Sequence, residues 1–179
     1  MYFWRQSNFM KRYIYLLVLV FPTLLAFQEP CNPLAVVDMA NKNTFAAVYT
    51  LPYFTRNYLP NDNLGDAHVL ALVEKDGIKD LVWLDDVTMK GDSIFTGTVR
   101  NHPKCANIEK GHNQEVHYNE IVDWIYYELK EDKSIVKHGS FSDGQWYIGE
   151  DINFQNLCGS ATKMYNMQMR QNRIKEIKQ

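Results

Sequence analysis

The sequence predicts an α+β domain in which an N-terminal helix, broken near Pro52, packs on a curved antiparallel sheet of five or six strands. Three observations lead to this fold. Apolar residues recur at helical spacing between residues 34 and 59, and strand-like alternation begins after Ala67. The chain has 179 residues, of which 46% are hydrophobic and 13% aromatic. That composition suffices for the core of one domain and excludes a mainly disordered chain.

The predicted helix covers residues 34–59, with Asp38 or Asn41 as its N-terminal cap. Pro52 is expected to break it, because proline lacks the N–H that a helix interior needs. Thr50 is then expected to cap a second, short helix before residue 60. The apolar positions of the two segments are Val37, Ala40, Phe45, Val48, Tyr49, Phe54 and Tyr58.

Six runs of strand character follow the helical region. They cover residues 67–74, 78–88, 93–100, 115–118, 122–130 and 135–141. Turn sequences at Asp76-Gly77 and around Gly91 join the first three runs into a meander, and a polar loop follows over residues 101–114. The sheet is therefore expected to be antiparallel.

Alternation along the second strand places apolar residues on both of its faces. The pattern puts Leu81, Trp83, Asp85 and Val87 on one face and Val82, Leu84 and Asp86 on the other. The two adjacent acids, Asp85 and Asp86, are also consistent with a β-bulge at one of them. One face is expected to pack on the helix. The other is expected to line a curved or barrel-like interior.

Residues 1–27 are predicted to be a signal peptide. Lys11 and Arg12 precede an apolar run of about 15 residues, shorter than the roughly 20 that a membrane-spanning helix needs. Cleavage is expected after Ala26, and Met10 is the predicted true start because a basic segment and the apolar run follow it directly. These features predict export to the periplasm or the exterior, with an uncleaved N-terminal membrane anchor as the alternative.

The remaining chain divides into a linker, one domain and a tail. The linker covers residues 28–33, the domain covers residues 34–157, and the tail covers residues 158–179. The tail is basic and is expected to be either helical or frayed. Without residues 1–27 the chain has 16 basic and 21 acidic residues, a net charge of −5. This balance provides no strong positive field for nucleic acid or an anionic membrane.

The chain has three cysteines, Cys31, Cys105 and Cys158. In an oxidising compartment, one disulfide and one remaining thiol are the natural interpretation. Cys105 with Cys158 would tie a loop to the end of the domain, whereas Cys31 lies in the linker. The pairing is left open, and three unpaired thiols are an alternative.

An ordered set of motifs resembles the YegJ-like domain family of unknown function. The segments are LPYF, VWLDDVTMKGDSIFTGTVRNHP and EIVDWIYYEL, and the resemblance covers roughly residues 40–141. The positions that carry it are Trp83, Asp86, Val87, Phe95, Gly97, Asn101, Pro103, Ile121, Asp123, Trp124 and Tyr126. The resemblance implies an exported bacterial α+β domain. It implies no established activity and no cofactor.

One loop contains residue types that zinc favours. His102, Cys105, His112 and His117 form the pattern H-x2-C-x6-H-x4-H. The spacing matches no familiar zinc site, and an exported cysteine is more often in a disulfide. Solvated loop histidines are the favoured interpretation, so neither a metal nor any other cofactor is predicted.

Acidic residues are the candidates for catalysis. Asp85, Asp86, Asp92 and Asp123 include carboxylates that could work as a general acid and base in a cleft. Asp92 lies in a turn where aspartate is favoured for local hydrogen bonds. A small exported hydrolase that uses Asp85, Asp86 and Asp123 is kept as the alternative function.

The favoured function is a non-catalytic module of the bacterial envelope that binds an unknown protein or envelope component, not nucleic acid. Trp83 and Trp124 are assigned to the core. Trp146 and Tyr147 are better candidates for exposed contact, because these residue types are enriched at interfaces. Together with Asp86 and Asp123 they form the predicted ligand or partner surface.

Overall fold

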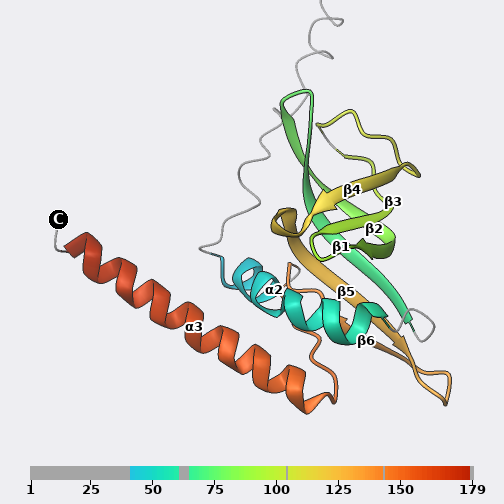
Figure 1. Cartoon of the computed structure of the whole chain (residues 1–179). Coiled ribbons are helices and arrows are strands. Elements are labelled where there is room, and N and C mark those ends of the chain that lie inside the picture. Colours follow the sequence, from blue (N-terminus) through green and yellow to red (C-terminus); the bar gives the residue numbers. More distant parts are fainter. Residues whose placement is uncertain (1–40, 61–64, 104, 143, 178–179) are drawn as a thin grey trace, which may run out of the picture. The chain divides into compact units, whose positions relative to one another are not determined.

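The computed structural model describes residues 41–60, 65–103, 105–142 and 144–177 (Figure 1). The chain divides into two units, residues 1–32 and 33–179, and every described residue belongs to the second. The predicted signal peptide, the linker and residues 34–40 of the predicted helix lie outside the described residues. Within these ranges, no helix combines the length and the apolar character needed to cross a membrane.

The first described helix, α2, is Lys42–Tyr53, and the π-helical turn η2, Phe54–Tyr58, follows without a break. Asn41, one of the two predicted caps, begins the helix, because its side chain accepts the N–H of Asn43 at 2.8 Å. The side of α2 that faces the sheet is made of small and apolar residues. Its buried members are Ala46, Ala47, Thr50 and Leu51.

Pro52 lies inside α2, which ends one residue later at Tyr53, so the predicted change near Pro52 is present as a switch to the π turn of η2, and the chain stays helical through it. The proline is exposed, so the hydrogen bond that it cannot make is lost on the side of the helix open to water. Thr50 caps no second helix either. It is fully buried, and its hydroxyl donates back to the carbonyl of Ala46 at 2.8 Å. The wide π turn of η2 follows directly, with Leu59 N–H donating to Phe54 O.

Six antiparallel strands form one open sheet, as the alternation and the turn residues predict. They are β1 Gly65–Lys75, β2 Ile78–Lys90, β3 Ile94–Val99, β4 Asn113–His117, β5 Ile121–Leu129 and β6 Ile135–Gly139. A 3-10 turn, η4 Tyr118–Glu120, joins β4 to β5. The strand order is β4-β3-β2-β1-β5-β6, so β4 and β6 are edges and the sheet does not close into the expected barrel-like interior.

A β-bulge in β2 changes the predicted faces of that strand. The register against β3 shifts between Asp85 and Thr88, and Asp86 has a positive φ of 52°. The extra residue turns Val87 to the core side, where Val82 and Leu84 are also buried. The prediction that Val87 shares a face with Leu81 is therefore wrong, and the bulge suggested by the paired acids is confirmed.

The core lies between α2 and the sheet, and Trp124 of β5 is at its centre. Trp124 is fully buried, stacks on Phe54 with ring centroids 4.9 Å apart, and donates its indole N–H to the hydroxyl of Thr50 at 3.1 Å. Trp83 is only half-buried and is not a member of this core. Of the two tryptophans assigned to the core, the structure thus places one there.

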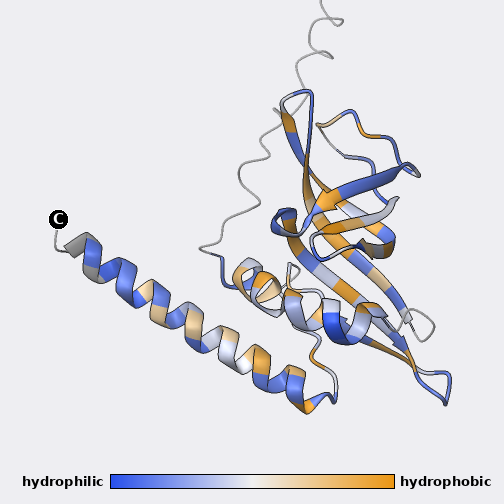
Figure 2. Ribbon diagram, in the orientation of Figure 1, coloured by the Kyte–Doolittle hydropathy of each residue, from blue (hydrophilic) through white to orange (hydrophobic). Residues whose placement is uncertain are grey.

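The chain ends in a long helix, α3 Ile152–Ile177, which begins six residues before the predicted tail. Its first half packs on the core through Phe154, Cys158 and Ala161, and the ring of Tyr165 contacts that of Phe45 in α2. Its second half extends beyond the end of α2 (Figure 1) and is mostly hydrophilic (Figure 2). The basic tail is therefore helical, as one of the two predicted alternatives has it.

Candidate functional site

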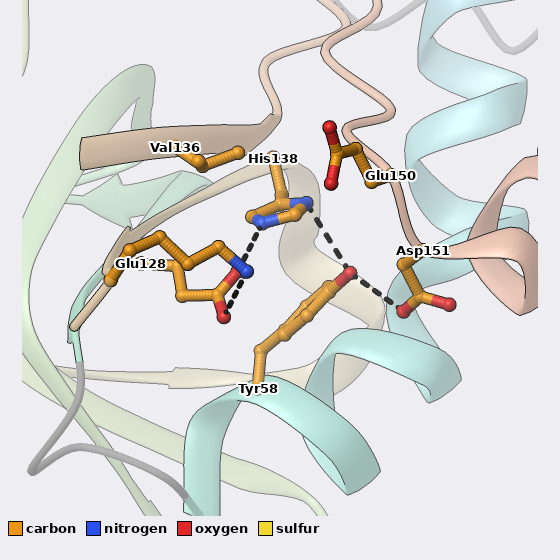
Figure 3. Close-up of a pocket in the computed structure, with 7 residues that line it drawn as sticks. Tyr58, Glu128, Val136, His138, Glu150 and Asp151 are labelled. Carbon is orange, nitrogen blue, oxygen red and sulfur yellow. Dashed lines mark hydrogen bonds and ion pairs between the residues drawn. The ribbon is translucent and has the colours of Figure 1, made fainter. Parts of the chain in front are cut away.

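A cavity of about 430 Å³ lies over the part of the β5–β6 hairpin that is near its turn (Figure 3). Strands β5 and β6 supply one side, η2 supplies another, and the residues that lead into α3 close the third. The lining residues are Tyr58, Glu128, Lys130, Val136, His138, Glu150 and Asp151. This combination of an aromatic, a histidine and several charged groups makes the cavity the candidate functional site, named here the His138 pocket.

The register of the hairpin brings His138 and Glu128 together. Glu128 pairs with Val136 and Tyr126 pairs with His138, so Glu128 and His138 are diagonal neighbours on one face. His138 is 2% exposed, and its Nε2 lies 2.9 Å from Oε2 of Glu128. Because a carboxylate only accepts hydrogen bonds, Nε2 is the donor in this contact, and Nδ1 lies toward the hydroxyl of Tyr58.

Tyr58 closes the other side of His138. Its ring stacks on the imidazole with centroids 4.9 Å apart, and its hydroxyl lies 3.4 Å from Nδ1. The same hydroxyl donates to Oδ2 of Asp151 at 3.1 Å. Burial, followed by the negative charge of Asp151, raises the pKa of Tyr58 far above its ordinary value. Tyr58 is therefore a neutral hydrogen-bond donor and not a phenolate nucleophile.

Asp151 links the pocket to the beginning of α3. Its Oδ1 accepts the backbone N–H groups of Asn153 and Phe154 at 3.0 and 3.2 Å, in the manner of an N-terminal cap. Its Oδ2 accepts the hydroxyls of Tyr58 and, at 2.6 Å, of Tyr53. Burial raises the pKa of Asp151, but these hydrogen bonds outweigh burial and bring the pKa below its ordinary value. The carboxylate is thus ionised and fixed in place.

Glu128 is held from two sides. Lys130 Nζ donates to Oε1 at 2.7 Å while His138 occupies Oε2. Burial raises the pKa of Glu128, and the hydrogen bonds of Lys130 and His138 more than reverse this, so the pKa is lowered. Glu150 also lines the cavity and is exposed. The pocket thus contains three carboxylates against one ammonium group, and it is negative with His138 in either protonation state.

Tyr58 and two of the carboxylates of this pocket have pKa values that are displaced from neutrality. A general acid or base works best with a pKa near the ambient pH. Here the pKa of Tyr58 is shifted upward, and those of Glu128 and Asp151 downward, each away from neutrality. What remains is a half-enclosed, negatively charged space with an aromatic wall, which is the kind of surroundings that favours a cation.

A second buried histidine, His68 of β1, contacts the predicted catalytic residue Asp85. His68 Nδ1 lies 2.7 Å from Oδ1 of Asp85, and Nε2 lies 3.1 Å from Oδ2 of Asp66. Arg100 reaches the same oxygen of Asp85 at 3.7 Å. Asp85 is thus part of an ion-pair cluster that joins β1, β2 and the end of β3.

The two other predicted acids have different surroundings. Asp86 is exposed on the bulge of β2. Asp123 is fully buried, and its oxygens accept backbone N–H groups of Trp124, Phe141 and Ser142 at 2.8, 3.0 and 2.8 Å. Burial raises the pKa of Asp123 in spite of these hydrogen bonds. The carboxylate of Asp123 therefore holds the chain after β6 in place.

Trp146 and Tyr147, the predicted contact residues, are half-buried and both are engaged within the chain. Trp146 donates its indole N–H to Asn43 Oδ1 at 2.9 Å, and so ties its loop to α2. Tyr147 exchanges two backbone hydrogen bonds with Gly139, and the ammonium group of Lys137 lies 4.1 Å from its ring centroid. Trp146 thus fastens its loop to α2, and Tyr147 extends the β6 edge.

The histidine and cysteine loop does not assemble as a metal site in the described part of the chain, where no group of three or more possible ligands converges. Cys105 is in a disulfide, so its sulfur is not available as a thiolate ligand. His102, His112 and His117 are exposed, and His112 lies 3.1 Å from Glu109. Cys158 is free and buried, so Cys105 and Cys158 are not paired with each other.

Sequence reasoning singled out none of the residues that line the His138 pocket. The hairpin register carried a usable signal, because a turn near residue 132 places Glu128 and His138 on one face. No local pattern points to Tyr58 or Asp151, which lie 80 and 13 residues from His138 along the chain. They reach the pocket only through the packing of η2 and α3.

The comparison with protein families covers the helix and the whole sheet. A family described as "Uncharacterized protein conserved in bacteria (DUF2314)" matches residues 41–142. No curated protein and no solved structure matches the chain. The matched range is more than half of the chain and includes Tyr58, Glu128, Lys130 and His138 of the pocket, whereas Glu150 and Asp151 follow it. The protein therefore belongs to this family of bacterial proteins, DUF2314.

Proposed function

We propose that the protein is a non-catalytic binding module exported to the bacterial envelope, and that the His138 pocket binds a positively charged group of its ligand. The observation that carries the proposal is the pocket itself. Three carboxylates and one ammonium group surround a cavity of about 430 Å³, and the side chains of Tyr58, Glu128 and Asp151 are fixed by hydrogen bonds within the chain. A primary amine or a guanidinium group complements this charge.

Two features support export. Cys105 is in a disulfide, and disulfides persist in oxidising compartments such as the periplasm. The apolar run before residue 28 has the composition of a signal peptide or of a short anchor. The YegJ-like resemblance, over roughly residues 40–141, coincides with the family match over residues 41–142, and we infer that the two describe one family.

The hydrolase alternative finds less support. It requires Asp85, Asp86 and Asp123 in one open cleft, with displaced pKa values. Asp123 is fully buried with its oxygens occupied, and Asp86 is exposed on a bulge. Asp85 is held by His68 and lies on β2, which β1 separates from β5 and Asp123.

The test is a thermal-shift series with probes of one length and different charge: cadaverine, hexanol and hexanoate. A ligand that binds only the folded state raises the melting temperature. At a free ligand concentration one hundred times its Kd, it adds about 2.7 kcal/mol to the free energy of unfolding. We expect stabilisation by cadaverine alone, and its loss in Glu150→Gln, which removes one pocket charge. Glu131→Gln, in the exposed turn before β6, is the matched control and should behave as wild type.

Two results would overturn the proposal. The first is equal or stronger stabilisation by hexanoate, because an anion should be repelled from this pocket. The second is a reproducible turnover of an ester or amide substrate that His138→Gln abolishes while the melting temperature is unchanged. That result would move the assignment from binding to catalysis.

A further inference from the structure

Helix α3 and the preceding part of the domain carry net charges of opposite sign. Residues 41–151 contain 11 basic and 18 acidic side chains, a net charge of −7, whereas α3 contains four basic residues and one acidic residue. The first 24 residues of α3, 152–175, include no acidic residue at all. The small net charge of the whole chain does not reveal this division, which appears only when the basic tail and the acidic domain are counted separately.

The basic residues lie on the part of α3 that leaves the core. Among the side chains of α3 that the structure describes, the last buried one is Ala161, and the last ring contact with α2 is that of Tyr165. Lys163, Arg170, Arg173 and Lys175 are exposed and follow or flank this point. Figure 1 shows the C-terminal half of α3 extending beyond α2, and Arg170, Arg173 and Lys175 belong to that half.

An apolar element accompanies the cations. Met167 is 53% exposed and lies four residues after Lys163 and three before Arg170. Residues at these spacings share one helix face, so the three side chains form an exposed stripe of cation, thioether and cation. Met164, 45% exposed, lies beside the stripe. Lysine and arginine can lay their apolar stems along such a side chain and keep their charged ends at the headgroups of a bilayer.

We propose that the exposed half of α3 binds the surface of an anionic lipid bilayer. Its cations contact the headgroup phosphates, and Met164 and Met167 enter the boundary between headgroups and acyl chains. The net negative charge of the sheet opposes its contact with the same surface, whereas α3 has four basic residues against one acidic residue. This inference is independent of the ligand assigned to the His138 pocket.

The experiment is vesicle flotation of the protein in the form that cells accumulate. Vesicles of phosphatidylcholine are compared with vesicles that also contain phosphatidylglycerol. The variants are Lys163→Glu/Arg170→Glu and, as a control with the same change in charge, Lys110→Glu/Lys133→Glu on exposed turns of the acidic body. Helix content by circular dichroism confirms that each variant is folded.

We expect binding to the anionic vesicles and at least a tenfold weaker binding to the neutral ones. The α3 variant should lose at least tenfold in binding to anionic vesicles, and 0.5 M salt should have a similar effect on wild type. The control variant should bind as wild type, because its changed residues do not belong to the stripe. Met167→Ser should weaken the binding that remains at high salt.

Two outcomes would overturn the proposal. Equal binding of wild type and of the α3 variant to anionic vesicles would assign membrane contact to another segment, such as the leader. Absence of vesicle binding, together with a dimer in light scattering that the α3 variant dissociates, would show that the stripe contacts the acidic body of a second copy.

Discussion

The hydroxyl of Tyr58 donates to Oδ2 of Asp151 at 3.1 Å, and this hydrogen bond ties the end of η2 to the beginning of α3 across 93 residues of chain. Asp151 also caps α3 through two backbone N–H groups. One carboxylate therefore closes the wall of the pocket and anchors the helix that carries the basic stripe. The family match ends at residue 142, before this carboxylate.

Replacement of Asp151 by alanine removes the cap and leaves the hydroxyls of Tyr53 and Tyr58 without this acceptor. The expected loss is about 2 kcal/mol in the free energy of unfolding, measured by urea denaturation. Asp132→Ala is the matched control, because Asp132 accepts similar bonds from Ser134 in an exposed turn. Its effect should be much smaller, because Asp132 is fully exposed and its hydrogen bonds compete with water. Equal effects of the two changes would contradict the anchoring role.

The contribution of Asp151 also depends on pH. Its folded pKa is lowered, so its stabilising effect is present above the unfolded pKa of about 3.9 and is lost as pH falls through the lower folded value. The difference in unfolding free energy between wild type and Asp151→Asn should therefore be constant near neutral pH and shrink below about pH 4. A difference that grows on acidification would contradict this sign.

Gly139 has a φ of +81°, and a Cβ there would lie 2.4 Å from the carbonyl oxygen of Trp124. Gly139→Ala combines backbone strain with a collision in the core and should cost about 3 kcal/mol, or prevent folding. Gly77 has a similar φ of +77° with open space around it, so Gly77→Ala should cost only about 1 kcal/mol. Thermal unfolding of the two variants separates the collision from the strain.

Asp123→Asn and Asp86→Asn should differ in their effect on stability. In Asp123→Asn an amide nitrogen replaces an oxygen that accepts a backbone N–H, so a loss of about 1 to 3 kcal/mol is expected. Asp86 is exposed at positive φ, a conformation that asparagine also tolerates, and Asp86→Asn should change stability by about 0.5 kcal/mol or less. The reverse order in urea denaturation would refute this assignment.

Thiol labelling checks the cysteine assignment. Burial raises the pKa of the Cys158 thiol to about 12, so the folded protein should resist iodoacetamide. In denaturant without reductant, mass spectrometry should find one alkylated cysteine, and after reduction three. Two or more labelled thiols before reduction would argue against a disulfide at Cys105.

The sheet could be predicted because its local signals agree with one another. Alternating apolar residues and the turns at Asp76-Gly77 and Gly91 define the β1–β2–β3 meander, and the observed strands differ from the predicted ones by only a few residues. Errors arose where tertiary packing decides. Burial of Thr50 against Trp124 and an exposed position for Pro52 keep the helix continuous.

The pocket could not be predicted from local pattern. Glu128 and His138 follow from the hairpin register, but Tyr58 and Asp151 join them through helices that pack from distant parts of the chain. The acids that the sequence does single out, Asp86 and Asp123, belong to a bulge and to a buried hydrogen-bond network. The hydrogen bonds of Asp123 give that residue a structural role, whereas the role of Asp86 as a contact residue stays a prediction.

The most direct test of the binding role is a titration of the isotopically labelled protein with cadaverine, followed by amide chemical shifts. The account predicts saturable shifts confined to the His138 pocket, at Tyr58, residues 136–138 and residues 150–151, and their loss in Glu150→Gln. Shifts that fall instead on the His68 cluster, or that persist unchanged in Glu150→Gln, would contradict the assignment of this pocket as the ligand site.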